Sequence, residues 1–250
     1  MVLPLFKSHY SVGKSILTLD KKGSSDSNGT CSVIDLCLEE KIKDLYLVDD
    51  SMGGFLEAYI NSKDAGLNFR FGLRLSVCDT KEKSEDSLER TSKYLIFANN
   101  KAGYEKLIKI YTFAAKDGFY YEPRIDFESL KSFWSEKDLT LVIPFYDSFL
   151  HQNSLRGSLC VPDFSFCTPR FLQEENDIPF NFLINKHLKN YCQDKYEILK
   201  SKSIYYKNKI DFKAYLTFRC INKRTTLNKP NLEHMTSNEF SLESWKEQQA

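Results

Sequence analysis

The sequence lacks the features that mark secreted, membrane-spanning and zinc-binding proteins. Its seven cysteines are an odd number without a CxxC pair, and its four histidines form no HxH or HExxH motif. No apolar run reaches the roughly 18 residues that a membrane span needs, and the first ten residues do not resemble a secretion signal. We therefore expect reduced thiols, no membrane partner and a cytoplasmic location.

Neither sign of charge is in excess. The chain has 35 Lys and Arg residues against 34 Asp and Glu residues, a net charge of +1. A domain that binds DNA through bulk charge is strongly basic, so DNA as a partner would require a local basic patch. The 42% of hydrophobic residues excludes global disorder, and 250 residues suffice for a large core.

Apolar periodicity predicts alternating strands and helices, which favours a parallel α/β architecture. Strands are expected over residues 44–49, 68–77, 93–98 and 139–143, and helices after Ser32 and over residues 53–65, 101–115, 178–191 and 215–222. Apolar residues are expected to share one face of the helix 53–65 (Phe55, Leu56, Tyr59 and Ile60) and to point inward on the helix 101–115 (Tyr104, Leu107, Ile108 and Tyr111).

Two polar stretches are predicted to form loops. Residues 20–30 are polar or charged apart from two glycines, and none is apolar. We therefore expect a mobile loop or an inserted hairpin tip that proteases cut first. Residues 80–91 are highly charged and are expected to form a surface loop.

Local patterns leave the chemistry open. Asp49 and Asp50 end a predicted strand, where they could hold a divalent cation or be ordinary solvated acids. Asp147 and His151 are four residues apart and would share one face of a helix. They could bind a metal ion together or be an ordinary surface or core pair. Ser8 stands where a P-loop ending in Gly-Lys-Ser at residues 13–15 needs a glycine, which argues against phosphate binding there.

A compact aromatic loop with one arginine covers residues 118–126, and it could be a stacking surface or a packed loop; packing is favoured. This loop and several other segments together resemble one known domain. The segments are Tyr10-Ser11, 47–52, 71–75, 95–109, 118–126, 223–232 and 238–242. They are similar to the PHP (polymerase and histidinol phosphatase) domain of bacterial DNA polymerase III alpha subunits.

The resemblance implies a distorted seven-stranded β/α barrel, TIM-like, as one domain over residues 1–250. It implies an inserted loop at about 20–30 and a segment at about 223–250 that resembles the junction to a polymerase body. Family members hold up to three metals with His, Asp, Glu and sometimes Cys, and such a cluster activates water against a phosphoester. The equivalent positions here are Leu5, Lys7, Lys14, Asp50, Arg74, Lys93, Phe145, Ser203 and Tyr205.

Only Asp50 of these nine positions keeps an oxygen ligand, so we expect no metal, no other cofactor and no catalytic residue. Four cations stand where metal charge would be, namely Lys7, Lys14, Arg74 and Lys93. We expect them to converge at one end of the barrel, where they pair with Asp49 and Asp50 or bind an anion such as phosphate.

The resemblance thus implies a degenerate, non-catalytic domain of a replication protein, which carries or docks the polymerase body or a proofreading exonuclease. Two alternatives stay open. One is a metal-dependent phosphoesterase or 3′–5′ exonuclease with a site rebuilt from Asp49, Asp50, His9, Asp147 or His151. The other is a module that binds an anion or DNA through the basic end of the barrel.

Overall fold

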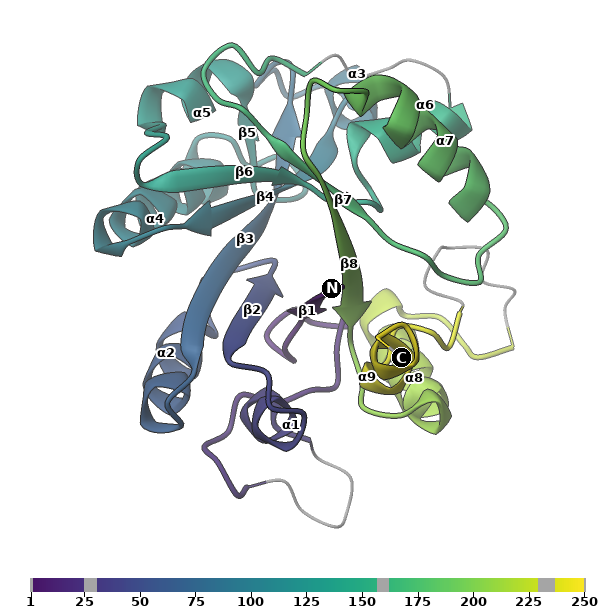
Figure 1. Cartoon of the computed structure of the whole chain (residues 1–250). Coiled ribbons are helices and arrows are strands. Elements are labelled where there is room, and N and C mark those ends of the chain that lie inside the picture. Colours follow the sequence, from purple (N-terminus) through teal and green to yellow (C-terminus); the bar gives the residue numbers. More distant parts are fainter. Residues whose placement is uncertain (1, 25–30, 157–161, 229–236, 250) are drawn as a thin grey trace. The chain divides into compact units, whose positions relative to one another are not determined.

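The computed structural model describes residues 2–24, 31–156, 162–228 and 237–249. They form two compact units, and Figure 1 labels their elements. Unit 1 comprises Met1–Phe71, Glu174–Ile178 and Lys200–Ala250, and unit 2 comprises Gly72–Gln173 and Pro179–Leu199. Two strands, β3 (Asn68–Cys78) and β8 (Ile198–Ile204), contribute residues to both units.

Unit 1 contains three parallel strands, with β1 in the middle. Strand β1 (Leu3–Phe6) pairs on one side with β2 (Asp44–Asp49) and on the other with β8, both in parallel. The helices of this unit are α1 (Val33–Glu39), α2 (Phe55–Asp64), α8 (Phe212–Lys223) and α9 (Leu242–Glu247), with a short 3₁₀ helix η1 (Lys209–Asp211) before α8.

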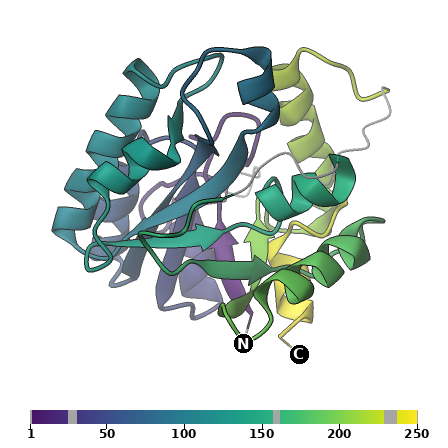
Figure 2. The same cartoon turned by 90° about the horizontal axis from the view of Figure 1, so that it is seen from above.

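Unit 2 contains most of β3 and the strands β4 (Ser92–Ala98), β5 (Arg124–Asp126), β6 (Leu139–Ile143) and β7 (Arg170–Gln173). Its helices are α3 (Glu85–Glu89), α4 (Lys101–Lys116), α5 (Phe127–Phe133), α6 (Phe149–Arg156) and α7 (Asn181–Cys192). In Figure 2, α6 and α7 lie next to each other at the edge of this unit.

The described strands pair in the order β2-β1-β8-β7-β6-β4-β3-β5, and β2 also pairs with β3. Seven strands therefore form a closed ring, and the α/β barrel that the resemblance implied is confirmed. The expectation of an all-parallel sheet is wrong. Strand β4 runs antiparallel to both of its neighbours, β3 and β6. The sheet is therefore mixed.

Helix α1 begins as predicted, because the Ser32 side chain accepts a hydrogen bond from the Ile34 backbone N–H. The apolar residues that were expected to share one face of α2 are not the buried residues of this helix. Phe55 is half-buried, but Leu56, Tyr59 and Ile60 are exposed, and the buried residues of this helix are the small Ala58 and Ser62. On α4, Leu107 is buried as expected, whereas Ile108 is exposed and Ile110 is buried in its place.

The region 80–91, expected to be a loop, contains the one-turn helix α3, which Ser84 caps by accepting from the Ser87 N–H. The six cysteines of the described ranges are free, and three of them (Cys37, Cys78 and Cys192) are buried. Cys160 and residues 25–30 of the predicted loop lie outside the described residues. No helix in the described ranges is long and apolar enough to cross a bilayer.

Candidate functional site

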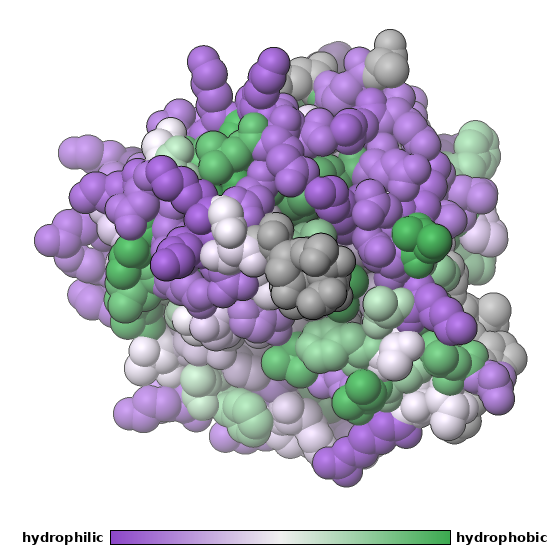
Figure 3. All heavy atoms as spheres, turned by 90° about the horizontal axis from the view of Figure 1, so that it is seen from below, coloured by the Kyte–Doolittle hydropathy of each residue, from purple (hydrophilic) through white to green (hydrophobic). Residues whose placement is uncertain are grey.

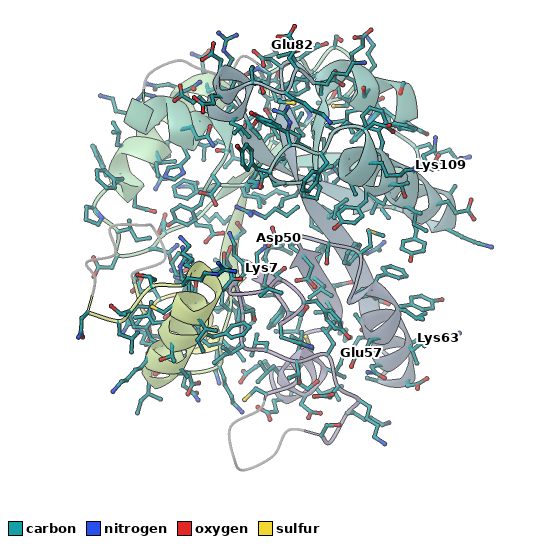
Figure 4. All side chains as sticks on the ribbon, turned by 180° about the vertical axis from the view of Figure 1, so that it is seen from behind. Lys7, Asp50, Glu57, Lys63, Glu82 and Lys109 are labelled. Carbon is teal, nitrogen blue, oxygen red and sulfur yellow. The ribbon has the colours of Figure 1, made fainter. Side chains whose placement is uncertain are left out.

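The first part of the candidate site lies in unit 1, after two parallel strands. Lys7 directly follows β1 and Asp50 directly follows β2, so the pairing of these strands brings the two side chains to the same edge. The Lys7 Nζ lies 3.2 Å from the Asp50 Oδ2. The Lys7 side chain is only 5% exposed, and Figure 4 shows the pair. The expected pairing of Lys7 with Asp50 is therefore confirmed.

Asp49 has a different role. It is fully buried, and its carboxylate accepts three hydrogen bonds from neutral donors. The Ser8 N–H donates to Oδ1 at 3.0 Å, the Ser11 Oγ donates to Oδ1 at 2.8 Å, and the Ser8 Oγ donates to Oδ2 at 2.6 Å. Asp49 therefore ties the loop after β1 to the end of β2, and the expectation that it meets one of the four cations is wrong.

The second part of the site lies in unit 2, around the loop after β6. The Arg74 guanidinium on β3 forms an ion pair with the Asp147 carboxylate. Asp147 has a φ of +61°. Its N–H donates to His151 Nδ1 at 2.8 Å, and its carbonyl accepts from the Lys93 N–H at 2.8 Å. Because the Nδ1 of His151 accepts this hydrogen bond, its lone pair is not available to a metal ion.

Lys93 forms the third ion pair, also within unit 2. Its Nζ lies 2.8 Å from the Glu122 Oε2, and it contacts the Ser76 Oγ, which donates to the Glu122 Oε1. The cross-strand register places Ser76 opposite Lys93. Burial acts to raise the pKa of Glu122, but Lys93, Ser76 and Arg74 together hold this pKa below its ordinary value. Glu122 is therefore a carboxylate that already has its counter-ion.

A buried carboxylate lies beside Ser203, another predicted ligand-equivalent position. Glu174 follows β7, is 2% exposed, and accepts hydrogen bonds from the Ser203 Oγ at 2.6 Å and the Ser203 N–H at 3.3 Å. Burial raises the pKa of Glu174, although Ser203, Lys202 and Asn176 oppose this effect. The fully buried Lys202 Nζ donates to the Glu175 carbonyl at 3.1 Å.

The remaining ligand-equivalent positions have packing roles. Leu5 and Phe145 are buried, and the Phe145 ring lies 4.9 Å from that of Tyr146. Tyr205 is buried and stacks on Phe240, with 5.3 Å between ring centroids. Lys14 is half-buried in a loop, and its N–H donates to the Ser11 carbonyl. The convergence of Lys7, Lys14, Arg74 and Lys93 on one end of the barrel stays a prediction.

The aromatic loop 118–126 is packed only in part, because Phe119 and Tyr121 are 46% and 77% exposed whereas its arginine is buried. Arg124 is fully buried, donates to the Ser87 Oγ and to the carbonyls of Glu82 and Gly118, and lies over the Tyr120 ring. A side chain at Gly118 would meet the Arg124 carbonyl at 1.9 Å, so only glycine fits this close approach.

These residues do not fit a cluster of divalent metals. Within the described ranges, no three His, Cys, Asp or Glu side chains are grouped to hold an ion. The Nδ1 of His9 is buried without a hydrogen-bond partner, but His9 belongs to no such group. The retained Asp50 is engaged by Lys7, and the other acids near the ligand positions are engaged by Arg74, Lys93 and Ser203.

Sequence reasoning missed two acids of this site, Glu122 and Glu174. Asp147 was named as a candidate metal ligand, but its pairing with Arg74 was not predicted. Each partner is distant along the chain, since Glu122 is 29 residues from Lys93 and Asp147 is 73 residues from Arg74. Spacing therefore gave no signal, although Glu174 does follow an apolar strand end, where an acid could have been noted.

Comparison with known proteins gives matches to one family. The model of the PHP domain family matches residues 24–153. The chain is 34% identical over 83 residues to the DNA polymerase III subunit alpha of Borreliella burgdorferi, which covers 32% of this chain and 7% of that protein. It is 43% identical over 60 residues to the DNA polymerase III subunit alpha of Aquifex aeolicus, covering 22% of this chain and 5% of that protein.

Proposed function

The chain belongs to the PHP domain family, and from this membership we propose that it is a non-catalytic PHP domain of a DNA polymerase III alpha-like replication protein. In this role it acts as a structural or docking module in the cytoplasm. The three ion pairs Lys7–Asp50, Arg74–Asp147 and Lys93–Glu122 are the observation that carries the proposal.

The ion pairs oppose metal binding through charge. Two unit charges 4 Å apart repel by about 4 kcal/mol at an effective dielectric constant of 20, and a divalent ion beside a lysine doubles that figure. Lys7, Arg74 and Lys93 each place a positive charge at a position where the family has a metal ligand. The charge of the lost ions is thus supplied by the protein, and the nearby acids stay neutralised without metal.

The enzymatic alternative needs acids and imidazoles that can turn toward an ion. Asp49 is saturated by Ser8 and Ser11, and Asp50 is paired with Lys7. Asp147 is paired with Arg74, and its N–H donates to His151. Rebuilding a metal site would break several of these buried contacts at once, which disfavours it.

The docking role is supported by the relatives and by the surface. Both relatives are named as alpha subunits of DNA polymerase III, and the chain spans only 7% and 5% of their lengths. We therefore propose the polymerase body or a proofreading exonuclease as partner. Leu56 and Ile60 on α2 are 64% and 47% exposed, the type of surface that such contacts cover. Figure 3 shows hydrophobic residues in separate patches on one face of the molecule.

A hydrolysis assay tests the proposal. The purified chain is incubated with Mn²⁺, Zn²⁺ or Mg²⁺ and either p-nitrophenyl phosphate or a 5′-labelled oligonucleotide. We expect no turnover above that of a blank purification. Metal-dependent hydrolysis that Asp50→Asn abolishes, and that the exposed Asp64→Asn control on α2 leaves unchanged, would establish the enzymatic alternative instead.

A further inference from the structure

The charge of this chain is unevenly distributed. Residues 200–224 contain eight Lys and Arg residues and a single acid, Asp211, in a chain whose net charge is only +1. All residues of this segment belong to unit 1, and its C-terminal half forms α8. A protein with almost no net charge needs such a local cluster of basic residues to bind a polyanion, and this segment provides one.

Several of these charges are already neutralised. Lys207 pairs with Glu39 at 2.9 Å, and Lys209 pairs with Glu247 at 2.6 Å. The Asp211 carboxylate accepts from the Asn208 N–H at 2.8 Å and so serves the turn before α8. The lysine Lys202 is fully buried. Of the other cations, Lys200 lies on β8 and the buried Arg219 donates to the Tyr215 hydroxyl at 3.1 Å. The exposed cations on or directly after α8 are Lys213, Lys223 and Arg224.

Two charges at the ends of α8 are exposed. Lys213 is near the start of the helix, and Arg224 is the residue that ends it. They mark the two ends of α8, and both side chains are exposed. Within the described residues, neither side chain makes an ion pair. Arg224 also has a φ of +53°, which turns the chain away at this end.

A neighbouring loop rests on the same end of α8. Gly13 has a φ of +71°, and a side chain there would meet the Asn222 side chain at 2.7 Å. This close approach places the loop that contains Lys14 beside the last turn of α8, next to Lys223 and Arg224.

We propose that the outward face of α8, with Lys213 and Arg224, binds the phosphate backbone of double-stranded DNA. Phosphates contacted by Lys and Arg supply affinity that does not depend on sequence. None of the three aromatic residues of α8 is exposed, since Tyr215 is buried and Phe212 and Phe218 are half-buried. The face therefore lacks the stacking platform with which proteins grip single strands, and this favours a duplex. The site is independent of the ion pairs described above.

Fluorescence anisotropy with a 24-base-pair duplex between 50 and 200 mM NaCl tests the site. The variant Lys213→Ala/Arg224→Ala removes both charges. Its matched control, Lys63→Ala/Lys109→Ala, removes two exposed lysines of α2 and α4, which Figure 4 labels. We expect the first variant to bind at least about tenfold more weakly at 50 mM NaCl and its salt slope to fall by about 2, since each phosphate contact contributes about 1. The control should match the unmodified protein.

Further measurements identify the ligand and test whether the charges themselves are required. Lys213→Arg/Arg224→Lys keeps both charges and should keep the affinity, which a purely structural role of the original side chains would not predict. A single strand of the same length should bind more weakly than the duplex. The proposal is overturned by equal losses in both alanine variants, by no binding to the duplex, or by tighter binding to phosphatidylserine vesicles than to DNA. None of these results bears on whether the chain hydrolyses phosphoesters.

Discussion

The Lys7 ammonium lies 3.2 Å from the carboxylate of Asp50. Our proposal is that the lysine takes the place of a metal ion beside this acid. Two further ion pairs lie in unit 2, where Arg74 pairs with Asp147 and Lys93 pairs with Glu122. In each pair, the resemblance predicts that the cation stands at a ligand-equivalent position, and the acid comes from another strand or loop.

The Lys7–Asp50 pair gives the first prediction. Asp50→Ala leaves the Lys7 ammonium, 5% exposed, without this partner, and should lower the free energy of unfolding by about 2 kcal/mol. The double variant Lys7→Met/Asp50→Ala removes both charges and should be more stable than Asp50→Ala alone. Urea unfolding of the three proteins measures both differences. Equal stability of the single and double variants would show that the buried ammonium costs nothing.

The second prediction concerns Arg74. Arg74→Glu places a carboxylate beside Asp147 in a site where Arg74 is 8% exposed, and should destabilise the fold by about 3 kcal/mol. Arg70 provides the matched control, because it lies on the same strand and is exposed. Arg70→Glu should shift the urea midpoint by little. Similar shifts of the urea midpoint for both variants would mean that the Arg74–Asp147 pair does not contribute to the stability of the fold.

The third prediction is a pH dependence from Glu122. The pKa of this group is lowered in the folded protein, so its ionised form adds stability above the unfolded pKa, and this contribution is lost as the pH falls through the folded pKa. The stability difference between the unmodified protein and Glu122→Gln should therefore shrink as the pH falls from about 6 to about 3. A difference that stays constant over this range would contradict the assignment.

Glu174 should show the opposite sign, which is the fourth prediction. Burial raises its pKa in the folded protein, so the protonated form is favoured, and stability is lost as the pH rises through the folded pKa. Relative to Glu174→Gln, the unmodified protein should lose stability as the pH rises from about 4 to 8. Thermal unfolding at several pH values gives this difference, and a rise across the range would refute the raised pKa.

The fifth prediction concerns the thiols. Burial raises the pKa of Cys37 to about 12 and that of Cys192 to about 11, so neither is a thiolate at neutral pH. With iodoacetamide at pH 7.5, both should be alkylated only after unfolding, whereas the half-buried Cys31 and Cys220 should react first. Mass spectrometry of peptides identifies the modified residues. Rapid alkylation of Cys37 in the native protein would contradict its burial.

The strands and the barrel could be predicted because they depend on local patterns and on resemblance. The strand Asp44–Asp49 and the strand Leu139–Ile143 were predicted with their exact limits. The exposure of the apolar residues of α2 could not be predicted. Periodicity identifies which residues share a helix face, but not whether that face packs against the core, and here the small Ala58 and Ser62 are the buried residues. The partners of Arg74 and Lys93 lie on distant loops, which only the folded chain brings together.

Titration of Mn²⁺ and Zn²⁺ into the metal-free protein by isothermal calorimetry, with elemental analysis after dialysis, tests the central claim most directly. The claim is that ion pairs of the protein replace the metals of the family. It predicts no stoichiometric binding of either ion and no change of the melting temperature with EDTA. Near-stoichiometric binding that is lost in Asp50→Ala and kept in Asp64→Ala would contradict it.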